Sequence, residues 1–228
     1  YEICACLVGS EMCIRDRHTR EKNYRYACEV FSKVPVKPGK KKRVGITGEI
    51  YMKYSKLGND DIESFLLRQG MEPYSGGFVN YCLYLVDTER YKAEKYQHNP
   101  VMAKACAFVL HRLCEAQKHL LTVIGETDRF QTDLPFPELK EKVQGILAEG
   151  CNTGDGWLIA AEVIQYVEKG CGSVLILHPF GCLVSHVCER GILQRLHARF
   201  PDVSIQTIEY DYDQSKTLRE SRILLAIS

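Results

Sequence analysis

The sequence predicts an α/β fold in which parallel sheets carry helices on both faces, as in Rossmann-like and flavodoxin-like proteins. Short apolar runs that end in glycine or proline alternate with longer segments of helical periodicity. The same order of run, loop and helix occurs in both halves of the chain. This alternation is the pattern of βαβ units. We therefore expect two small lobes, over residues 43–135 and 136–228.

The first lobe begins with RVGITGEIY (residues 43–51), a short apolar run that reads as a buried strand and its C-terminal loop. Residues 55–70 follow as a helix, with acidic residues in its first turn and a glycine at its end. The chain is then expected to return to the sheet within MEPYSGGFVNYCLYLV (71–86), which contains Cys82. Residues 88–124 have helical spacing.

The second lobe repeats this order after a proline-broken loop and a short helix. The GDGW turn that opens its next helix either attracts an anion to free amides or is a tight turn that lets Trp157 pack. Ligands of such sheets gather where strands end, and Glu49, Cys182 and Asp211 fall at expected strand ends. The expected elements are a helix over 153–170, a strand over 171–179, a helix over 183–201, a strand over 203–211 and a helix over 215–227.

The N-terminal segment differs in character from the rest. Residues 1–17, YEICACLVGSEMCIRDR, have no clean period, and MCIRD is what the end of a transposon sequencing adaptor encodes. We expect this segment to be a sequencing artefact fused to a partial gene, and the native protein to continue upstream. Residues 18–42 contain two prolines and a basic run, which are typical of a linker.

Composition narrows the class of protein. The chain has 228 residues and a net charge of +1, so its bulk charge does not suggest nucleic acid or an anionic membrane as a partner. No apolar run approaches the roughly 18 residues that a membrane helix needs. The eleven cysteines have irregular spacing and form no C-x-x-C pair, which favours reduced thiols in a cytoplasmic protein over a disulfide framework.

Cys182 lies in LHPFGCLVSHVCERG (177–191), where an apolar run ends and a helix is expected to begin. A helix N-terminus lowers the pKa of a thiol, and the thiolate is both a nucleophile and a metal ligand. His178 and His186 are four residues away on either side. Spacing alone leaves three interpretations open: a core thiol, a nucleophile with a histidine base, and an iron or zinc ligand.

Taken together, the motifs resemble a known family. The chain is similar to the C-terminal part of the large proteins related to 2-hydroxyacyl-CoA dehydratases and their activases. The segments that carry the resemblance follow in order and are VGITGEIYMKYSKLGNDDIESFLLRQG, NYCLYLV, GDGWLIAAEVIQYVEKG, ILHPFGCLVSH and IEYDYDQSKTLRESRILLAI.

The resemblance implies an iron–sulfur protein with a 4Fe-4S cluster. In this family an ATP-hydrolysing activase, present as an upstream module or a partner subunit, injects one electron at low potential, and the resulting ketyl radical of an acyl-CoA substrate then loses water. The cofactor would thus be the cluster, with ATP acting only through the activase. An alternative is a non-catalytic docking module for an activase or partner subunit, with structural cysteines.

The same resemblance assigns residues. Cys182 matches the cysteine of a Pro-Phe-Gly-Cys-Leu motif and is the expected cluster ligand, and Cys82 matches the cysteine of a Tyr-Cys pattern as a further ligand. Cys151 stands just before the glycine turn and is a third candidate ligand. His186 matches a histidine after the motif that is expected to donate a hydrogen bond beside the cluster. Glu49 matches the glutamate of a Gly-Glu pair at the end of the first strand. The sequence departs from the family at His178, where glutamine is frequent, and at Val184-Ser185, where Pro-Asn is frequent.

Overall fold

The chain forms one four-stranded sheet in the computed structural model, which describes residues 17–36, 39, 41–127 and 129–228. All neighbouring strands are parallel, and their order is β2-β1-β3-β4. The prediction of an α/β fold with a parallel sheet is therefore confirmed. The strands are β1 (Arg43–Gly48), β2 (Glu72–Ser75), β3 (Cys171–Pro179) and β4 (Ser204–Tyr210).

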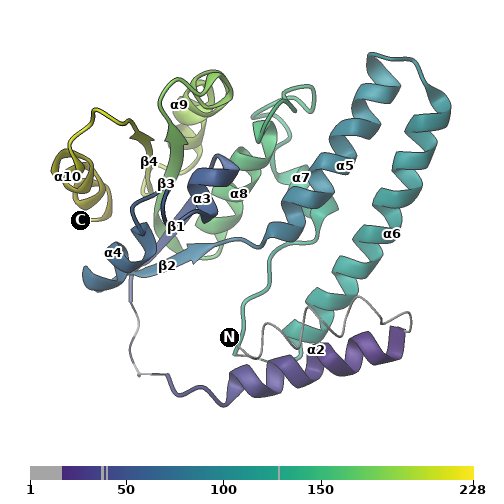
Figure 1. Cartoon of the computed structure of the whole chain (residues 1–228), viewed down its shortest axis with the longest axis horizontal. Coiled ribbons are helices and arrows are strands. Elements are labelled where there is room, and N and C mark those ends of the chain that lie inside the picture. The colour runs from purple at the N-terminus through teal and green to yellow at the C-terminus, as the bar shows by residue number, and fades with distance from the viewer. Residues whose placement is uncertain (1–16, 37–38, 40, 128) are drawn as a thin grey trace.

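Helices cover both faces of the sheet, as Figure 1 shows. The described residues contain nine α-helices and one π-helical turn. They are α2 (Arg17–Ser32), α3 (Ile50–Tyr54), α4 (Ile62–Arg68), α5 (Phe78–Lys95), α6 (Pro100–Gly125), α7 (Phe136–Lys142), α8 (Gly156–Glu168), η1 (Ser185–Glu189), α9 (Arg190–Arg199) and α10 (Lys216–Ile227).

The central strand β3 divides the core into two clusters because successive side chains of a strand point to opposite faces. Val174 and Ile176 pack with α8 and α9, whereas Leu175 and Leu177 pack with α4 and α10. All four side chains are fully buried. Helix α8 is buried along most of its length, which matches its apolar composition on all sides.

A single sheet joins the two residue ranges that we expected to form separate lobes. β1 pairs with β2 on one side, from Arg43 opposite Glu72, and with β3 on the other side, up to Gly48 opposite Leu177. Residues 43–135 and 136–228 thus supply two strands each to the same sheet. The core of either range is completed by the other.

The chain returns to the sheet within residues 71–86, as expected, but Cys82 lies in the helix that follows the returning strand. The returning strand is β2, which ends before Gly76, and α5 follows it. Buried positions in α5 include Asn80, Leu83, Tyr84 and Asp87, a spacing of three and four residues that places them on one face of a helix. Cys82 falls outside this face and is exposed.

Two further segments differ from expectation. The region predicted as a linker contains α2, which packs on α6 and whose Arg25 forms an ion pair with Glu126. The helical region 88–124 is divided between α5 and α6, because Pro100 starts a new helix that Asn99 caps by accepting a hydrogen bond from the Met102 amide at 3.1 Å. The proposed adaptor segment lies outside the described residues except for Arg17.

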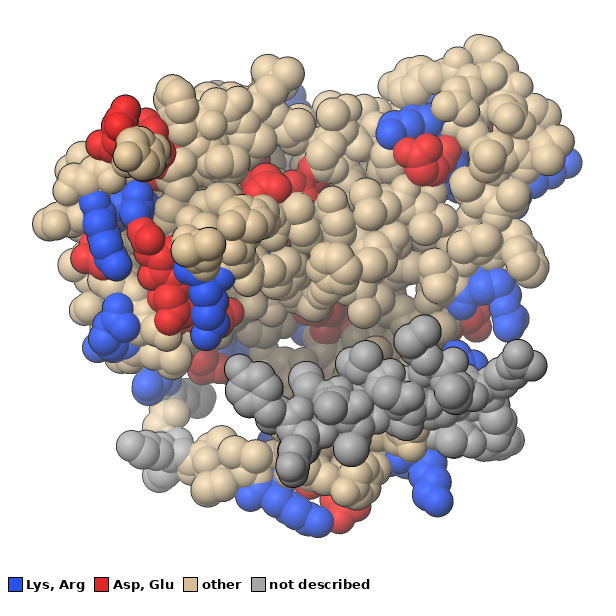
Figure 2. All heavy atoms as spheres, viewed as in Figure 1, with Lys and Arg blue, Asp and Glu red and all other residues tan. Residues whose placement is uncertain are grey.

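Surface charge is mixed on the face that Figure 2 shows. Lysine and arginine side chains lie among aspartates and glutamates there, beside a broad area of uncharged side chains. Within the part of the chain that the structure describes, no helix combines the length and apolar character needed to cross a membrane.

Gly45 in β1 allows α8 to approach the sheet closely, and Gly45→Ala is expected to destabilise the fold. A Cβ at this position would lie 2.7 Å from Cδ2 of Tyr166, a fully buried ring. Overpacking of this kind costs about 1–3 kcal/mol. Chemical denaturation should show this loss in the free energy of unfolding. Gly172→Ala is the matched control, since its Cβ would meet nothing within 4 Å, and an equal loss in both variants would contradict the prediction.

Candidate functional site

The carboxyl edge of the sheet has a topological switch point between β1 and β3. From β1 the chain moves to β2 on one side, and the next connection crosses back to β3 on the other side. Ligands of parallel α/β proteins bind outside strand ends at such a point. Three segments meet here: the start of α3, the turn before α8, and the loop that leads from β3 into η1.

Asp155 connects the turn before α8 to the end of β1. Its Oδ2 accepts a hydrogen bond from the Ile50 amide at 3.4 Å, and the residue is buried. Burial raises the pKa of Asp155 to about 7, and the nearby negative charge of Glu49 contributes to the rise. The hydrogen bond from Ile50 opposes it. Asp155 is thus a buried carboxyl group that is partly protonated near neutral pH.

Glu189, the last residue of η1, is a second buried carboxyl group at the same edge. It has no exposed surface, and neither of its carboxylate oxygens has a hydrogen-bond partner of normal geometry. Burial raises the pKa of Glu189 to about 7, the Ser185 hydroxyl opposes this rise, and the charge of Asp155 adds to it. Burial of a charged carboxylate without a partner is costly. Such a group is therefore either protonated or retained for a function.

Glu49, which we predicted as a cofactor-binding residue, lies at the switch point and has a structural partner there. Its side chain accepts a hydrogen bond from the Met52 amide at 3.1 Å and thereby caps α3. Its own amide donates to the carbonyl of Leu177 in β3 at 2.8 Å. Its charge contributes to the raised pKa of both Asp155 and Glu189. Glu49 therefore acts on the site electrostatically.

These carboxyl groups give the edge acid–base capacity. A general acid or base works best when its pKa lies near the working pH, because both protonation states are then available. Carboxyl groups with shifted pKa values at the carboxyl edge of a sheet are therefore candidates for function. Asp155 and Glu189 meet that condition, and they come from segments that adjoin the switch point.

Cys182 lies where the sequence predicted, between the end of β3 and the helical turn that precedes η1. Gly181, with φ of 72°, makes the turn that brings the chain into this helix. The Sγ of Cys182 is 3.2 Å from the Ser185 hydroxyl, which donates to it. The backbone oxygen of Cys182 lies 2.8 Å from Nδ1 of His186.

The other predicted ligands are placed differently. Cys151 lies just before the turn that contains Asp155, and its thiol is hydrogen-bonded to Cys188 in η1. Burial, followed by the effect of Cys151, raises the pKa of Cys188. Cys82 is exposed on α5, the helix that leaves the carboxyl end of β2. The direct thiol contact that the structure assigns is therefore the pair of Cys151 and Cys188, and Cys188 was not among the predicted ligands.

A group of three metal-ligating side chains does occur among the described residues, and it contains no thiol. It consists of His178, His186 and Glu209, which offer ligand atoms that all lie within 4.8 Å of one another. His186 Nε2 is 3.4 Å and His178 Nδ1 is 3.9 Å from Oε2 of Glu209. The two imidazole rings are 5.4 Å apart in an edge-to-face arrangement.

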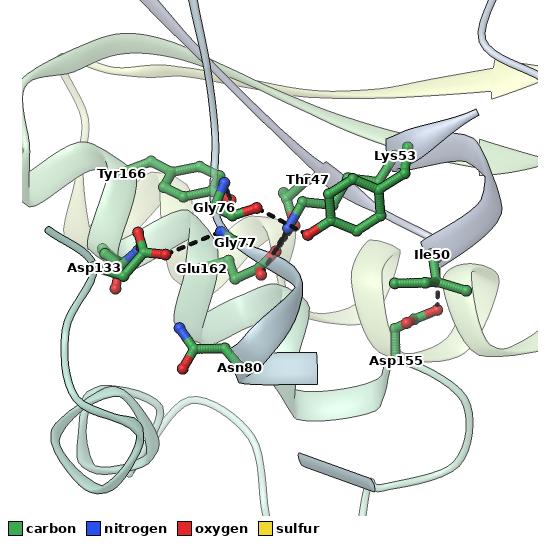
Figure 3. A network of polar contacts seen from close by, with 12 residues as sticks. Thr47, Ile50, Lys53, Gly76, Gly77, Asn80, Asp133, Asp155, Glu162 and Tyr166 are labelled. Carbon is green, nitrogen blue, oxygen red and sulfur yellow. Dashed lines mark hydrogen bonds and ion pairs between the residues drawn. The ribbon is translucent and has the colours of Figure 1, made fainter. Parts of the chain in front are cut away.

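A buried ion pair joins α3 and α8 next to the site, as Figure 3 shows. Nζ of Lys53 in α3 lies 2.8 Å from both carboxylate oxygens of Glu162 in α8, and the Thr47 hydroxyl donates to the same carboxylate at 2.6 Å. Burial alone would lower the pKa of Lys53, but the charge and hydrogen bond of Glu162, together with Tyr166 and Tyr54, outweigh it and raise this pKa well above its usual value. The pair is therefore charged.

A second set of contacts in Figure 3 fixes the chain after β2. The Tyr166 hydroxyl accepts from the Gly76 amide at 2.7 Å, and Oδ2 of Asp133 accepts from the Gly77 amide at 3.0 Å. The Tyr54 hydroxyl donates to the Gly76 carbonyl at 2.8 Å. These bonds connect the start of α5 to α3 and α8, and so they fix the position of α5 beside the carboxyl edge.

Several of these residues were not identified from sequence. Asp155 was part of a turn considered for its free amides or for the packing of Trp157, although an acid between two glycines at a helix start is a usable signal. Glu162 is the one charged residue among the buried residues of α8, and this exception in a buried helix could have indicated a pair. For Glu189 we find no local signal, since its burial depends on the packing of η1.

Comparisons with known proteins gave no match. Neither a family model, nor a curated protein, nor a solved structure is similar to this chain at a significant level. The resemblance to the dehydratase and activase-related group therefore stays a prediction from the motifs.

Loss of one partner of the buried ion pair is expected to destabilise the fold strongly. Glu162→Gln leaves the Lys53 charge buried without a counter-ion, which costs about 3–5 kcal/mol. Replacing both residues by apolar ones, Lys53→Met with Glu162→Leu, should cost less because no charge stays buried. Denaturant unfolding compares the two. A double variant that is as unstable as the single one would show that packing, and not charge, determines the loss.

Asp155→Asn and Glu189→Gln are expected to alter how stability depends on pH. A carboxyl group whose folded pKa is raised stabilises the fold in its protonated form at low pH, and this contribution is lost as the pH rises through the folded pKa, here about 7. Between about pH 5 and about pH 8, the free energy of unfolding of the original chain should fall by about 1–3 kcal/mol more than that of either variant.

Urea denaturation at both pH values measures this difference directly. Asp202→Asn is the matched control, since Asp202 is exposed. A pH dependence that is unchanged in the Asp155 and Glu189 variants would mean that neither carboxyl group titrates near neutral pH.

Proposed function

We propose that this chain is the C-terminal part of an iron–sulfur protein of the 2-hydroxyacyl-CoA dehydratase and activase-related group, which takes part in ATP-coupled, low-potential electron transfer to a CoA-linked substrate. One observation supports this proposal most. Glu49, Cys151 and Cys182 are far apart in the sequence, yet all three belong to segments at the carboxyl edge, beside the switch point.

The thiols of this chain do not by themselves complete a cluster site. Cys151 contacts Cys188, Cys182 is engaged by Ser185, and no group of three thiols stands among the metal-ligating groups of the described residues. A 4Fe-4S cluster is held by four cysteine thiolates around one core. The remaining ligands would have to come from another part of the protein or from a partner subunit, and we assign no step to the cluster.

The buried carboxyl groups suggest what this chain contributes to the reaction. Loss of water from a 2-hydroxyacyl compound requires a proton for the departing hydroxyl group and removal of a proton from the neighbouring carbon. A carboxylic acid can donate the first proton, and a carboxylate can accept the second, so that water and a carbon–carbon double bond are formed. Asp155, with a pKa of about 7 and a small exposed fraction, is the candidate for this proton transfer, whereas Glu189 has no exposed surface and can act only through its neighbours.

A second candidate function is docking of an activase or partner subunit. Three apolar side chains around Cys182 are exposed: Phe180 at 65%, Leu183 at 75% and Val187 at 63%. Exposed apolar residues that gather at one place are typical of interaction surfaces. In this alternative the neighbouring thiols pack and ligate nothing.

Reconstitution of the complete native gene product with iron and sulfide under anaerobic conditions tests the proposal. The protein should gain iron, sulfide and a broad visible absorption, and Cys182→Ser should lower the iron and sulfide content to about half or less, because a cluster that loses one thiolate is held poorly. The matched control is Cys106→Ser, which removes a half-buried thiol from α6. Equal cluster content in both variants would rule out Cys182 as a ligand.

A further inference from the structure

We propose that His178, His186 and Glu209 form a binding site for one divalent transition-metal ion of the zinc class, separate from any iron–sulfur centre. The three residues come from β3, η1 and β4. In the register of the sheet, His178 stands directly opposite Glu209. Neighbouring parallel strands present paired side chains to the same face, so the two strands place an imidazole and a carboxylate side by side.

Both imidazoles are oriented by backbone carbonyl groups. Nδ1 of His186 lies 2.8 Å from the carbonyl oxygen of Cys182, and Nδ1 of His178 lies 3.3 Å from that of Pro179. A carbonyl oxygen can only accept a hydrogen bond, so each Nδ1 carries the proton. Each Nε2 is then left with a free lone pair, the form in which histidine ligates a metal.

The lone pair of His178 has no other use in the structure. His178 has no exposed surface, and its Nε2 has no hydrogen-bond partner. Buried polar atoms are almost always paired, so an orphan nitrogen requires a reason such as an absent ion. The contact of His178 with Glu209 is made by Nδ1, at 3.9 Å, so ligation through Nε2 requires the imidazole to turn about its Cβ–Cγ bond.

The donor set suits a borderline transition-metal ion. Two imidazoles and one carboxylate ligate zinc in enzymes, and the same set ligates non-haem iron(II). Ligands around one zinc ion lie roughly 3.3–3.5 Å from one another, given metal–ligand bonds of about 2.0–2.2 Å. The group, with its ligand atoms within 4.8 Å, reaches this geometry by small side-chain shifts. Three protein ligands leave a fourth position open.

The π-helical turn η1 is what brings the third ligand in. His186 lies in this turn, five residues long, where the backbone departs from the α-helical pattern. Such turns are rare and frequently occur at functional sites. A metal ion here would tie η1 to the ends of β3 and β4 and would hold the loop that carries Cys182.

Arg190 is the cation that competes for this site. Its Nη2 lies 2.7 Å from Oε2 of Glu209, the oxygen that both histidines approach. The Arg190 side chain is nearly half exposed, so it can move into solvent when an ion binds. Arg190 therefore weakens binding by occupying the carboxylate and by its charge.

Calorimetric titration of the 228-residue chain with zinc ions alone tests the proposal. One ion should bind per chain, and cobalt(II) at the same site should give the intense visible absorption of a four-coordinate centre. His186→Gln and Glu209→Gln should each weaken zinc binding by roughly tenfold or more, because each removes one of three protein ligands. Arg190→Ala should strengthen it several-fold.

Two controls keep the result interpretable. His197→Gln removes a histidine of α9 that bonds to the Ile205 carbonyl and is not part of the group, and its zinc affinity should be unchanged. Far-ultraviolet circular dichroism checks that each variant is folded. The test uses no variant of His178, because replacement of this buried residue endangers the fold itself. Absence of zinc binding, or equal affinity in the original chain, His186→Gln and Glu209→Gln, overturns the proposal.

Discussion

The ion pair between Lys53 and Glu162 is the constraint on which the carboxyl edge depends. Both charges are withdrawn from water, so each requires the other in place, and the Thr47 hydroxyl completes the arrangement. The pair fastens α3 to α8 across the end of β1. The position of the Ile50 amide, and with it the hydrogen bond to Asp155, follows from this attachment. A single buried contact thus sets where two of the three segments of the site meet.

The site beside this pair has the opposite electrostatic character. Glu162 has a lysine as its counter-ion, whereas burial and the charges of neighbouring acids raise the pKa of Asp155 and Glu189. Neighbouring acids of one edge therefore have different surroundings, and functional sites use such differences to separate an acid from a base. Glu49 belongs to both environments, since it caps α3 and also repels the two raised carboxyl groups.

Sequence reasoning predicted those parts of the fold that local pattern determines. β3, β4 and α8 follow from uninterrupted apolar runs and from a glycine turn, and the position of Cys182 at a strand end follows with them. The return to the sheet was expected within residues 71–86 and occurs there as β2, but the apolar run around Cys82 belongs to a helix, because a short apolar run is compatible with either element until its packing partners are known. The group of His178, His186 and Glu209 depends on the register of β3 with β4 and on a π-helical turn, neither of which a single sequence specifies.

The order of strands in the sheet has a consequence for synthesis of the protein. β1 ends at Gly48, but the strand that pairs with its inner edge begins only at Cys171. At about 5–20 residues per second, on the order of ten seconds pass on the ribosome before this partner exists. During that interval β2, four residues long, is the neighbour available to β1. The open edge of β1 is then a template for pairing between nascent chains, a hazard that arises from the order of the gene and disappears once β3 is in place.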